Sequence, residues 1–360
     1  MPKYMRQPIS SITTGPRQSN MELLRIIAMF MVMVLHADYW SIGTPTSIDY
    51  QQNFFGASNR TFFQCLSIIS VNIFICISGW FGIKPSVKGF CGFIFQYCFF
   101  GILITSVMYA ITDQRVNIQY IRECFLIGPD LLWFVKSYLG LYILALPLNY
   151  FVQHASKQQF AFILIAFFSF QTIYGISGGA EFVMDGYSTF SFIGLYLLAR
   201  YCRLYLSLRN YINLTIWGGV ILTINFIIVN YLQSQDLSAS ALLSYINPVN
   251  IFGAISMVIG FSMIKIKPNK SINFIASSAF AVYLVHQASQ IGRPYYRPFF
   301  KSLYDHYSGI GCWAMFVITL VSIYLIAIIL DQPRKWLWRL LLKKAALIRK
   351  YDALLNEESK

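Results

Sequence analysis

The sequence predicts an all-α integral membrane protein, a bundle of about ten transmembrane helices with both termini in the cytoplasm. Apolar residues make up 57% of the 360 residues and charged residues only 12%, about half the charged fraction of a typical soluble protein. The apolar runs are continuous over about 20 residues, the length that crosses a bilayer as a helix, and they lack the alternation of a membrane β-barrel. The positive charges are also divided unevenly between the connections, which predicts the orientation.

Ten apolar stretches are long enough to cross a bilayer. To within a few residues we expect them at 20–40, 62–82, 88–112, 132–152, 159–177, 188–207, 211–232, 241–264, 272–292 and 310–331. With a cytoplasmic N-terminus, twenty Lys and Arg residues fall in cytoplasmic segments and six in outer connections. Such an excess follows the positive-inside rule. The net charge of +14 therefore reflects membrane topology, and the expected partner is a lipid bilayer rather than nucleic acid.

Two short tails are expected on the cytoplasmic side. Residues 1–19 are polar and lack the apolar core of a cleavable signal, so the first helix is expected to stay in the mature protein. Residues 333–360 open with a basic, aromatic stretch that is typical of an amphipathic helix on the inner leaflet. The seven cysteines form no Cys-x-x-Cys pair, so we expect buried thiols and no metal site.

The first apolar stretch carries three ionisable residues, Glu22, Arg25 and His36. Glu22 and Arg25 are three residues apart and can pair on one helix face. His36 lies eleven residues after Arg25, about 16 Å along nearly the same face. Because an ionisable ring inside a membrane is costly, it indicates a functional site. We interpret His36 as a catalytic base, since a neutral imidazole can take a proton near pH 7; a plain structural hydrogen bond is the alternative.

A second histidine, His286, is expected inside the ninth helix, with Tyr283 one turn away on the same face. Counted along the expected topology, His286 lies at a depth similar to that of His36. The two rings and Tyr283 are therefore expected to flank one cavity as catalytic residues. Two alternatives remain open: paired axial ligands of a haem and a structural bond between helices.

The fourth helix opens with further candidates for binding a substrate, Trp133, Lys136 and Tyr138. Aromatic packing and a lysine that reaches the outer interface are the alternatives for these side chains. The outer connections are also rich in carboxylates, which suit hydrogen bonds to sugar hydroxyls but are ordinary in such loops. These carboxylates belong to Asp49, Asp113, Glu123, Asp130, Glu181, Asp185, Asp236 and Asp305.

Four segments, taken together and in order, resemble the integral-membrane acyltransferase family 3. Each motif is weak alone, but four in sequence over about residues 18–335 are specific. The segments are Glu22 to Arg25 with His36, then 77–81 with its Ser-Gly pair, 133–149 ending in Pro-Leu-Asn, and 280–286 ending in Tyr-Leu-Val-His. The chain departs from the family in one place, because the region after 77–81 has Lys84 and Lys88 where many members carry two arginines.

The resemblance implies a transmembrane acyltransferase domain over 20–332 that moves an acyl group, usually acetyl, from cytoplasmic acyl-CoA to a hydroxyl of an exported or lipid-linked glycan. No cofactor would be bound permanently, since acetyl-CoA is the donor substrate. A multi-pass protein of the cell membrane is expected. The cations expected to bind the CoA phosphates are Arg25, oriented by Glu22, with Lys84, Lys88, Arg200 and Arg203. Trp133, Lys136 and Tyr138 would bind the acceptor. The alternative function is a glycan transporter or flippase without acyl-transfer chemistry.

Overall fold

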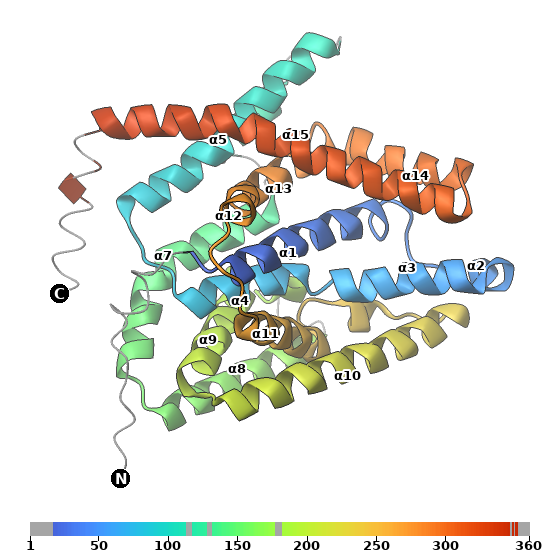
Figure 1. Ribbon diagram of the computed structural model, residues 1–360, viewed down its shortest axis with the longest axis horizontal. Helices are drawn as coiled ribbons and strands as arrows, with labels where there is room; N and C mark the ends of the chain where they lie inside the picture. Colours follow the sequence, from blue (N-terminus) through green and yellow to red (C-terminus); the bar gives the residue numbers. More distant parts are fainter. Residues whose placement is uncertain are drawn as a thin grey trace.

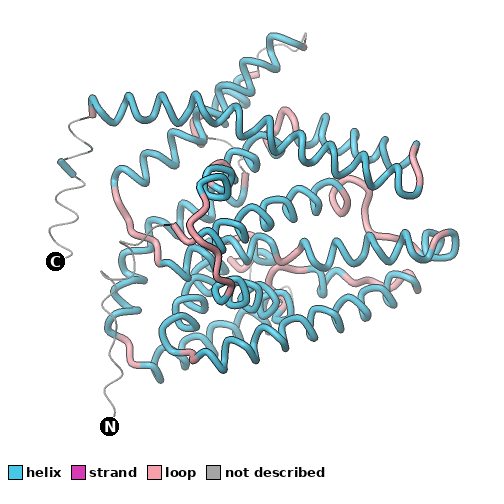
Figure 2. The backbone as a smooth tube through the Cα atoms, in the orientation of Figure 1, coloured by secondary structure: helices cyan, strands magenta, loops and turns pink. Residues whose placement is uncertain are grey.

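The computed structural model describes residues 17–112, 117–127, 132–176 and 182–345, together with residues 348, 350 and 351. Across these residues the regular elements are helices (Figure 2). The structure therefore confirms an all-helical membrane protein. Much of both expected tails lies outside the described residues, as do Asp113, Asp130 and Glu181.

Seven segments of the described chain are long and apolar enough to cross a membrane. They are Ser19–Ala37, Phe54–Phe81, Val87–Ile111, Trp133–His154, Leu208–Ser234, Ser240–Met263 and Gly309–Lys344. The other three expected spans fall on α8 (Lys157–Ile176), on α9 (Thr189–Tyr205), and on the pair α12 (Lys270–Ala276) and α13 (Ala279–Gln287). The count of ten crossings and the cytoplasmic side of the termini stay predictions.

Helix α1 (Ser19–Ala37) runs through the middle of the bundle (Figure 1). It contacts α3 (Phe54–Ser67), α4 (Ser70–Phe81), α11 (Pro248–Met263), α12, α13, α14 (Arg297–His306) and α15 (Gly309–Lys344). A helix that is apolar around most of its circumference is suited to such a buried position. The N-terminal end of α1 and the C-terminal end of α15 lie at one end of the bundle, at the left of Figure 1, which we call the inner end. The opposite end is the outer end.

The remaining helices surround this axis. Helix α5 (Val87–Ile111) contacts α13, and α7 (Trp133–His154) reaches α13 through the ring pair Phe134 and Tyr283, whereas α10 (Leu208–Ser234) packs on α11. Short helices complete the outer end, namely α2 (Ser47–Gln52), α6 (Ile118–Cys124) and a π-helix at Gly292–Tyr296 that leads directly into α14.

The expected ninth span is interrupted at Ser277 and Ser278, where α12 ends and α13 begins. The carboxylate of Asp331, from the middle of α15, lies beside this break. Asp331 Oδ2 accepts a hydrogen bond from Ser278 Oγ at 2.8 Å and pairs with Lys335 Nζ at 3.0 Å. Its other oxygen pairs with Arg334. A fully buried carboxylate with two cationic partners is compensated and can be held in an apolar bundle.

Helix α15 is longer than the expected tenth span of 310–331. It continues through Pro333 to Lys344, because Arg334 and Lys335 are held by Asp331 one turn earlier. The position of the expected basic tail on the inner leaflet stays a prediction.

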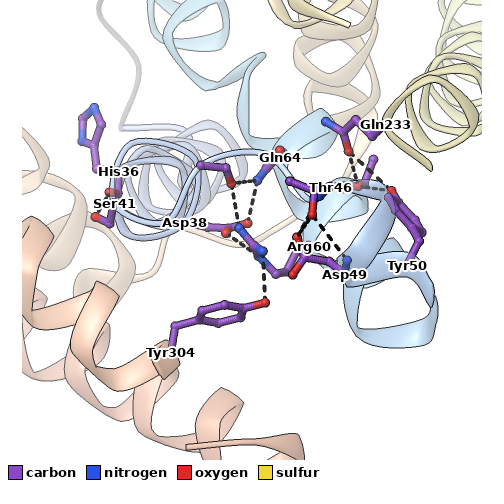
Figure 3. Close-up of polar contacts among 12 residues, drawn as sticks. His36, Asp38, Ser41, Thr46, Asp49, Tyr50, Arg60, Gln64, Gln233 and Tyr304 are labelled. Atoms are coloured by element: carbon purple, nitrogen blue, oxygen red, sulfur yellow. Dashed lines mark hydrogen bonds and ion pairs between the residues drawn. The ribbon is translucent and has the colours of Figure 1, made fainter. Parts of the chain in front are cut away.

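The chain after α1 is fixed by a buried ion pair between Asp38 and Arg60 (Figure 3). Arg60 Nε donates to Asp38 Oδ1 at 2.8 Å, and Arg60 Nη2 donates to the carbonyl of Gly43 at 2.6 Å. Gln64 Nε2 donates to Asp38 Oδ2 at 3.1 Å and to the same carbonyl at 3.0 Å. Gly43 has a φ of +100°, a conformation that favours glycine. The pair therefore ties α3 to the loop that follows α1.

We predict that Arg60→Met lowers the free energy of unfolding by about 3–5 kcal/mol, because the Asp38 carboxylate would stay buried without its counterion. Chemical unfolding in detergent micelles measures this loss. Lys301→Gln is the matched control. Its pair with Asp305 (2.7 Å) is roughly half exposed, so its loss should cost about 0–1 kcal/mol. Equal stability of the two variants would contradict a structural role for the buried pair.

Candidate active site at the junction of two cavities

A cavity of about 650 Å³ runs from the middle of the bundle toward the inner end. It is enclosed by α1, α4, α5, α7, α13 and the inner part of α15. Its cationic lining residues are Arg17, Arg25, Lys88 and Arg334. We call it the inner cavity. Its volume is in the usual range for the site of a small molecule or cofactor.

A second cavity of about 810 Å³ lies toward the outer end. Its lining combines the ring-bearing side chains Trp40, Tyr120 and Tyr187 with the cations Lys136, Arg293 and Arg297. We call it the outer cavity. Three residues line both cavities, His36, Trp133 and Tyr245. The two spaces therefore meet at the imidazole of His36.

The imidazole of His36 is hydrogen-bonded to that of His286. The separation between His36 Nδ1 and His286 Nε2 is 3.0 Å, and His286 Nδ1 lies 2.6 Å from the backbone carbonyl of Val282. A carbonyl can only accept, so His286 Nδ1 carries a proton, and in the neutral ring Nε2 is then an acceptor. His36 Nδ1 must therefore be the donor. This leaves His36 Nε2 with a free lone pair, which is the form of the ring that a general base needs.

The structure thus brings together the two histidines that the sequence placed at similar depth, but in unequal roles. His286 is 1% exposed and lines neither cavity, so it lies behind His36 rather than against a substrate. It orients the ring of His36 and fixes its tautomer. The 3.0 Å separation is that of a hydrogen bond, whereas nitrogens binding one metal ion from opposite sides are about 4 Å apart. The arrangement is therefore not that of axial haem ligands.

Tyr283 lines the inner cavity one turn before His286. Its ring packs edge-on against Phe134, with 5.5 Å between centroids, and lies perpendicular to the ring of His286 at 6.1 Å. Tyr283 is thus a wall of the inner cavity, next to the histidine pair.

Arg25 and Glu22 form the expected pair, with 2.5 Å between Arg25 Nη1 and Glu22 Oε2. Arg25 lines the inner cavity, whereas Glu22 is buried behind it. Lys88 also lines the cavity, but Lys84 is not among its lining residues.

Arg17 and Arg334 were missed as site residues, because both also fit the positive-inside pattern. One signal could have identified Arg334. Asp331 is an acidic residue inside an apolar stretch, and such a residue indicates an ionic partner nearby.

Arg200 and Arg203 lie outside the inner cavity, which corrects their expected place beside Arg25. Arg203 Nη1 donates to the carbonyl of Trp80 at 2.6 Å, and its guanidinium lies 5.3 Å from the ring centre of Phe81. Arg200 is 2% exposed and lies against Gly82, the residue that ends α4. The last carbonyls of a helix have no partner within it. Arg203 therefore stabilises the C-terminal end of α4, and Arg200 lies beside it.

The three residues expected to bind an acceptor are divided between the cavities. Lys136 lines the outer cavity and Trp133 lines both. Tyr138 lies in the inner cavity, stacked on Phe134 with 5.8 Å between centroids. Tyr138 follows Lys136 by two residues, about 200° around a helix, so the two side chains cannot share a face.

The model of an acyltransferase domain, acyltransferase family 3, matches residues 18–332. No curated protein and no solved structure matches. The matched residues include α1 with Arg25 and His36, the whole of α7, and α13 with His286. Because the match extends over most of the chain, this protein belongs to acyltransferase family 3.

Proposed function

We propose that this protein transfers an acyl group, acetyl in the simplest case, from cytoplasmic acyl-CoA to a hydroxyl of an exported or lipid-linked glycan. The observation that carries the proposal is the position of His36, where one imidazole lines both an inner and an outer cavity. A donor that enters from one end and an acceptor that enters from the other could meet at this ring. Membership in an acyltransferase family favours this function over a glycan transporter.

The charge of the inner cavity supports acyl-CoA as the donor. Four cations line it, Arg17, Arg25, Lys88 and Arg334. Phosphate groups bind to fixed cations through charge-assisted hydrogen bonds. The apolar and aromatic side chains between these cations and His36, such as Met29 and Phe93, suit the thin pantetheine arm. The inner end would then face the cytoplasm, where acyl-CoA is found, with the protein in the cell membrane.

The reaction needs one general base where the two cavities meet, and His36 is placed there. His36 Nε2 accepts the proton of the acceptor hydroxyl as the oxygen attacks the thioester carbonyl. When the tetrahedral intermediate collapses, the carbon–sulfur bond breaks, and the thiolate of CoA takes the proton from His36. Between these two proton transfers His36 carries a positive charge, which is stabilised by its hydrogen bond to His286. In the alternative route the same lone pair attacks the thioester, and CoA leaves as the thiolate. The acceptor hydroxyl then attacks the acyl-histidine, the acyl–nitrogen bond breaks, and the hydroxyl proton passes to the thiolate.

We predict that His36→Ala lowers acyl transfer by about 10²–10⁴-fold, the usual contribution of a general base. The assay follows radioactive acetyl from acetyl-CoA into base-labile esters of glycan in isolated membranes. His306→Ala is the control, because His306 is exposed on α14 and its hydrogen bonds to described residues are to Ser302 of the same helix. Activity in the His36 variant near that of the control would refute the assignment.

A second prediction concerns His286. His286→Ala should lower turnover by about 10–100-fold, the effect of losing one hydrogen bond to a group that becomes charged. His286→Gln should recover part of this loss, because the amide oxygen can accept from His36 Nδ1. Turnover is measured per folded molecule after size-exclusion chromatography. If both variants are merely less stable, with unchanged turnover per folded molecule, His286 is only structural.

A third prediction separates Arg25 from the arginines at the end of α4. Arg25→Gln should raise the KM for acetyl-CoA by about 10–100-fold, since it loses a charged hydrogen bond to phosphate. Arg203→Gln should leave this KM unchanged, because Arg203 is engaged by Trp80. Initial rates at varied acetyl-CoA concentration give both values. An unchanged KM for Arg25→Gln, or an equal rise in both variants, would count against the inner cavity as the CoA site.

A further inference from the structure

The outer cavity is cationic, although outer segments of such a protein are usually poor in Lys and Arg. Lys136 of α7, Arg293 of the π-helix and Arg297 of α14 line it, with Glu123 as the carboxylate among its described lining residues. Three cations from three elements thus share one space with His36.

Two of the other cations at the outer end are neutralised within the protein. Arg60 pairs with Asp38 and Lys301 pairs with Asp305. In the described part of the chain, Lys136, Arg293 and Arg297 form no such pair. The carboxylate of Glu123 is already engaged, because its Oε2 accepts a hydrogen bond from Ser289 Oγ at 2.6 Å.

The two arginines are held in a fixed relation to His36. Tyr296, in the π-helix between them, donates from its hydroxyl to the carbonyl of Met33 at 2.8 Å. Met33 is three residues before His36 on α1, so this bond attaches the π-helix one turn from the reacting ring. π-Helices are rare and occur frequently at functional sites. The guanidinium of Arg297 lies over the ring of Trp40 at 5.7 Å.

The guanidinium of Arg297 is also partly removed from water, and one of its donors has no hydrogen bond within the described chain to replace the lost water. Its Nε is buried and has no hydrogen-bond partner among the described residues. Burial, and then the nearby charge of Arg293, lower the pKa of Arg297 from its ordinary value. A buried donor without a partner is costly, and an incoming anion would satisfy it.

We propose that the acceptor carries an anionic group, which Lys136, Arg293 and Arg297 bind while a hydroxyl of the same molecule lies at His36. This inference rests on the proposed function and names the class of acceptor. The anion is either the carboxylate of an acidic sugar or the phosphate of a lipid carrier, both of which fit the planar fork of a guanidinium. Lys136 of α7 adds a point charge.

The test uses the full chain in lipid nanodiscs with acetyl-CoA and two matched pairs of acceptors. The first pair is a glucuronate-containing oligosaccharide and the same oligosaccharide with its carboxyl groups reduced to alcohols. The second pair is a polyprenyl-diphosphate-linked oligosaccharide and the same glycan released from its carrier. For the wild type, kcat/KM should favour the anionic member of at least one pair by about 10–100-fold, the effect of a charged hydrogen bond. The pair that shows the preference identifies the anion.

The double variant Arg293→Gln with Arg297→Gln should lose this preference and keep its rate with the neutral member, which also reports correct folding. The double variant Arg293→Lys with Arg297→Lys keeps the positive charge but loses the planar guanidinium. Its preference for the anionic acceptor should lie between those of the wild type and the double glutamine variant. Lys301→Gln, a change of the same kind on α14 outside the cavity, should keep the full preference. Equal use of both members of each pair by the wild type, or a preference that survives in the double glutamine variant, overturns the proposal.

Calorimetric binding of the acidic oligosaccharide distinguishes this inference from the proposed function. If the wild type transfers no acetyl group and releases no CoA, the proposed function fails. Tighter binding of the acidic acceptor to the wild type than to the double variant would still support an anion site. Equal binding would overturn it.

Discussion

The structure depends on one constraint, that each polar side chain on the central helix α1 must find a partner inside an apolar bundle. An unpartnered polar group is costly there, because neither lipid nor apolar side chains can hydrogen-bond to it. Asn20 donates to the carbonyl of Phe261 on α11 at 2.8 Å, and Ser19 bonds Asn273 on α12 at 3.1 Å. At the other end of α1, His36 bonds α13, and Asp38, just past its last residue, bonds α3. These bonds determine which face of α1 each neighbour can occupy.

Part of this arrangement could be predicted from the sequence. His36, Arg25 and His286 are expensive inside a membrane, so their presence indicated a site, and helical spacing with topology gave their relative depth. The direct bond between the two histidines is consistent with that depth. The all-helical fold and the positions of most helices also follow from the length of the apolar runs.

Other features could not be predicted, because they depend on how helices pack rather than on what each contains. Arg200 and Arg203 differ little in sequence context from a basic cluster that binds phosphate, and only the fold shows that they face the end of α4. The break at Ser277 and Ser278 lies against Asp331, which is far away in the sequence. Tyr138 was grouped with Lys136 by proximity along the chain, although the helix turns them to different cavities.

The hydrogen-bonded histidine pair has a consequence for the membrane as a barrier. A chain of hydrogen-bonded titratable rings inside a membrane is a route by which protons can leak down their gradient. Here the chain of hydrogen bonds runs from His36 through His286 to the carbonyl of Val282. A carbonyl cannot pass a proton onward, so the chain stops there. His36 can therefore take and return a proton at Nε2, while the chain of hydrogen bonds behind it conducts none.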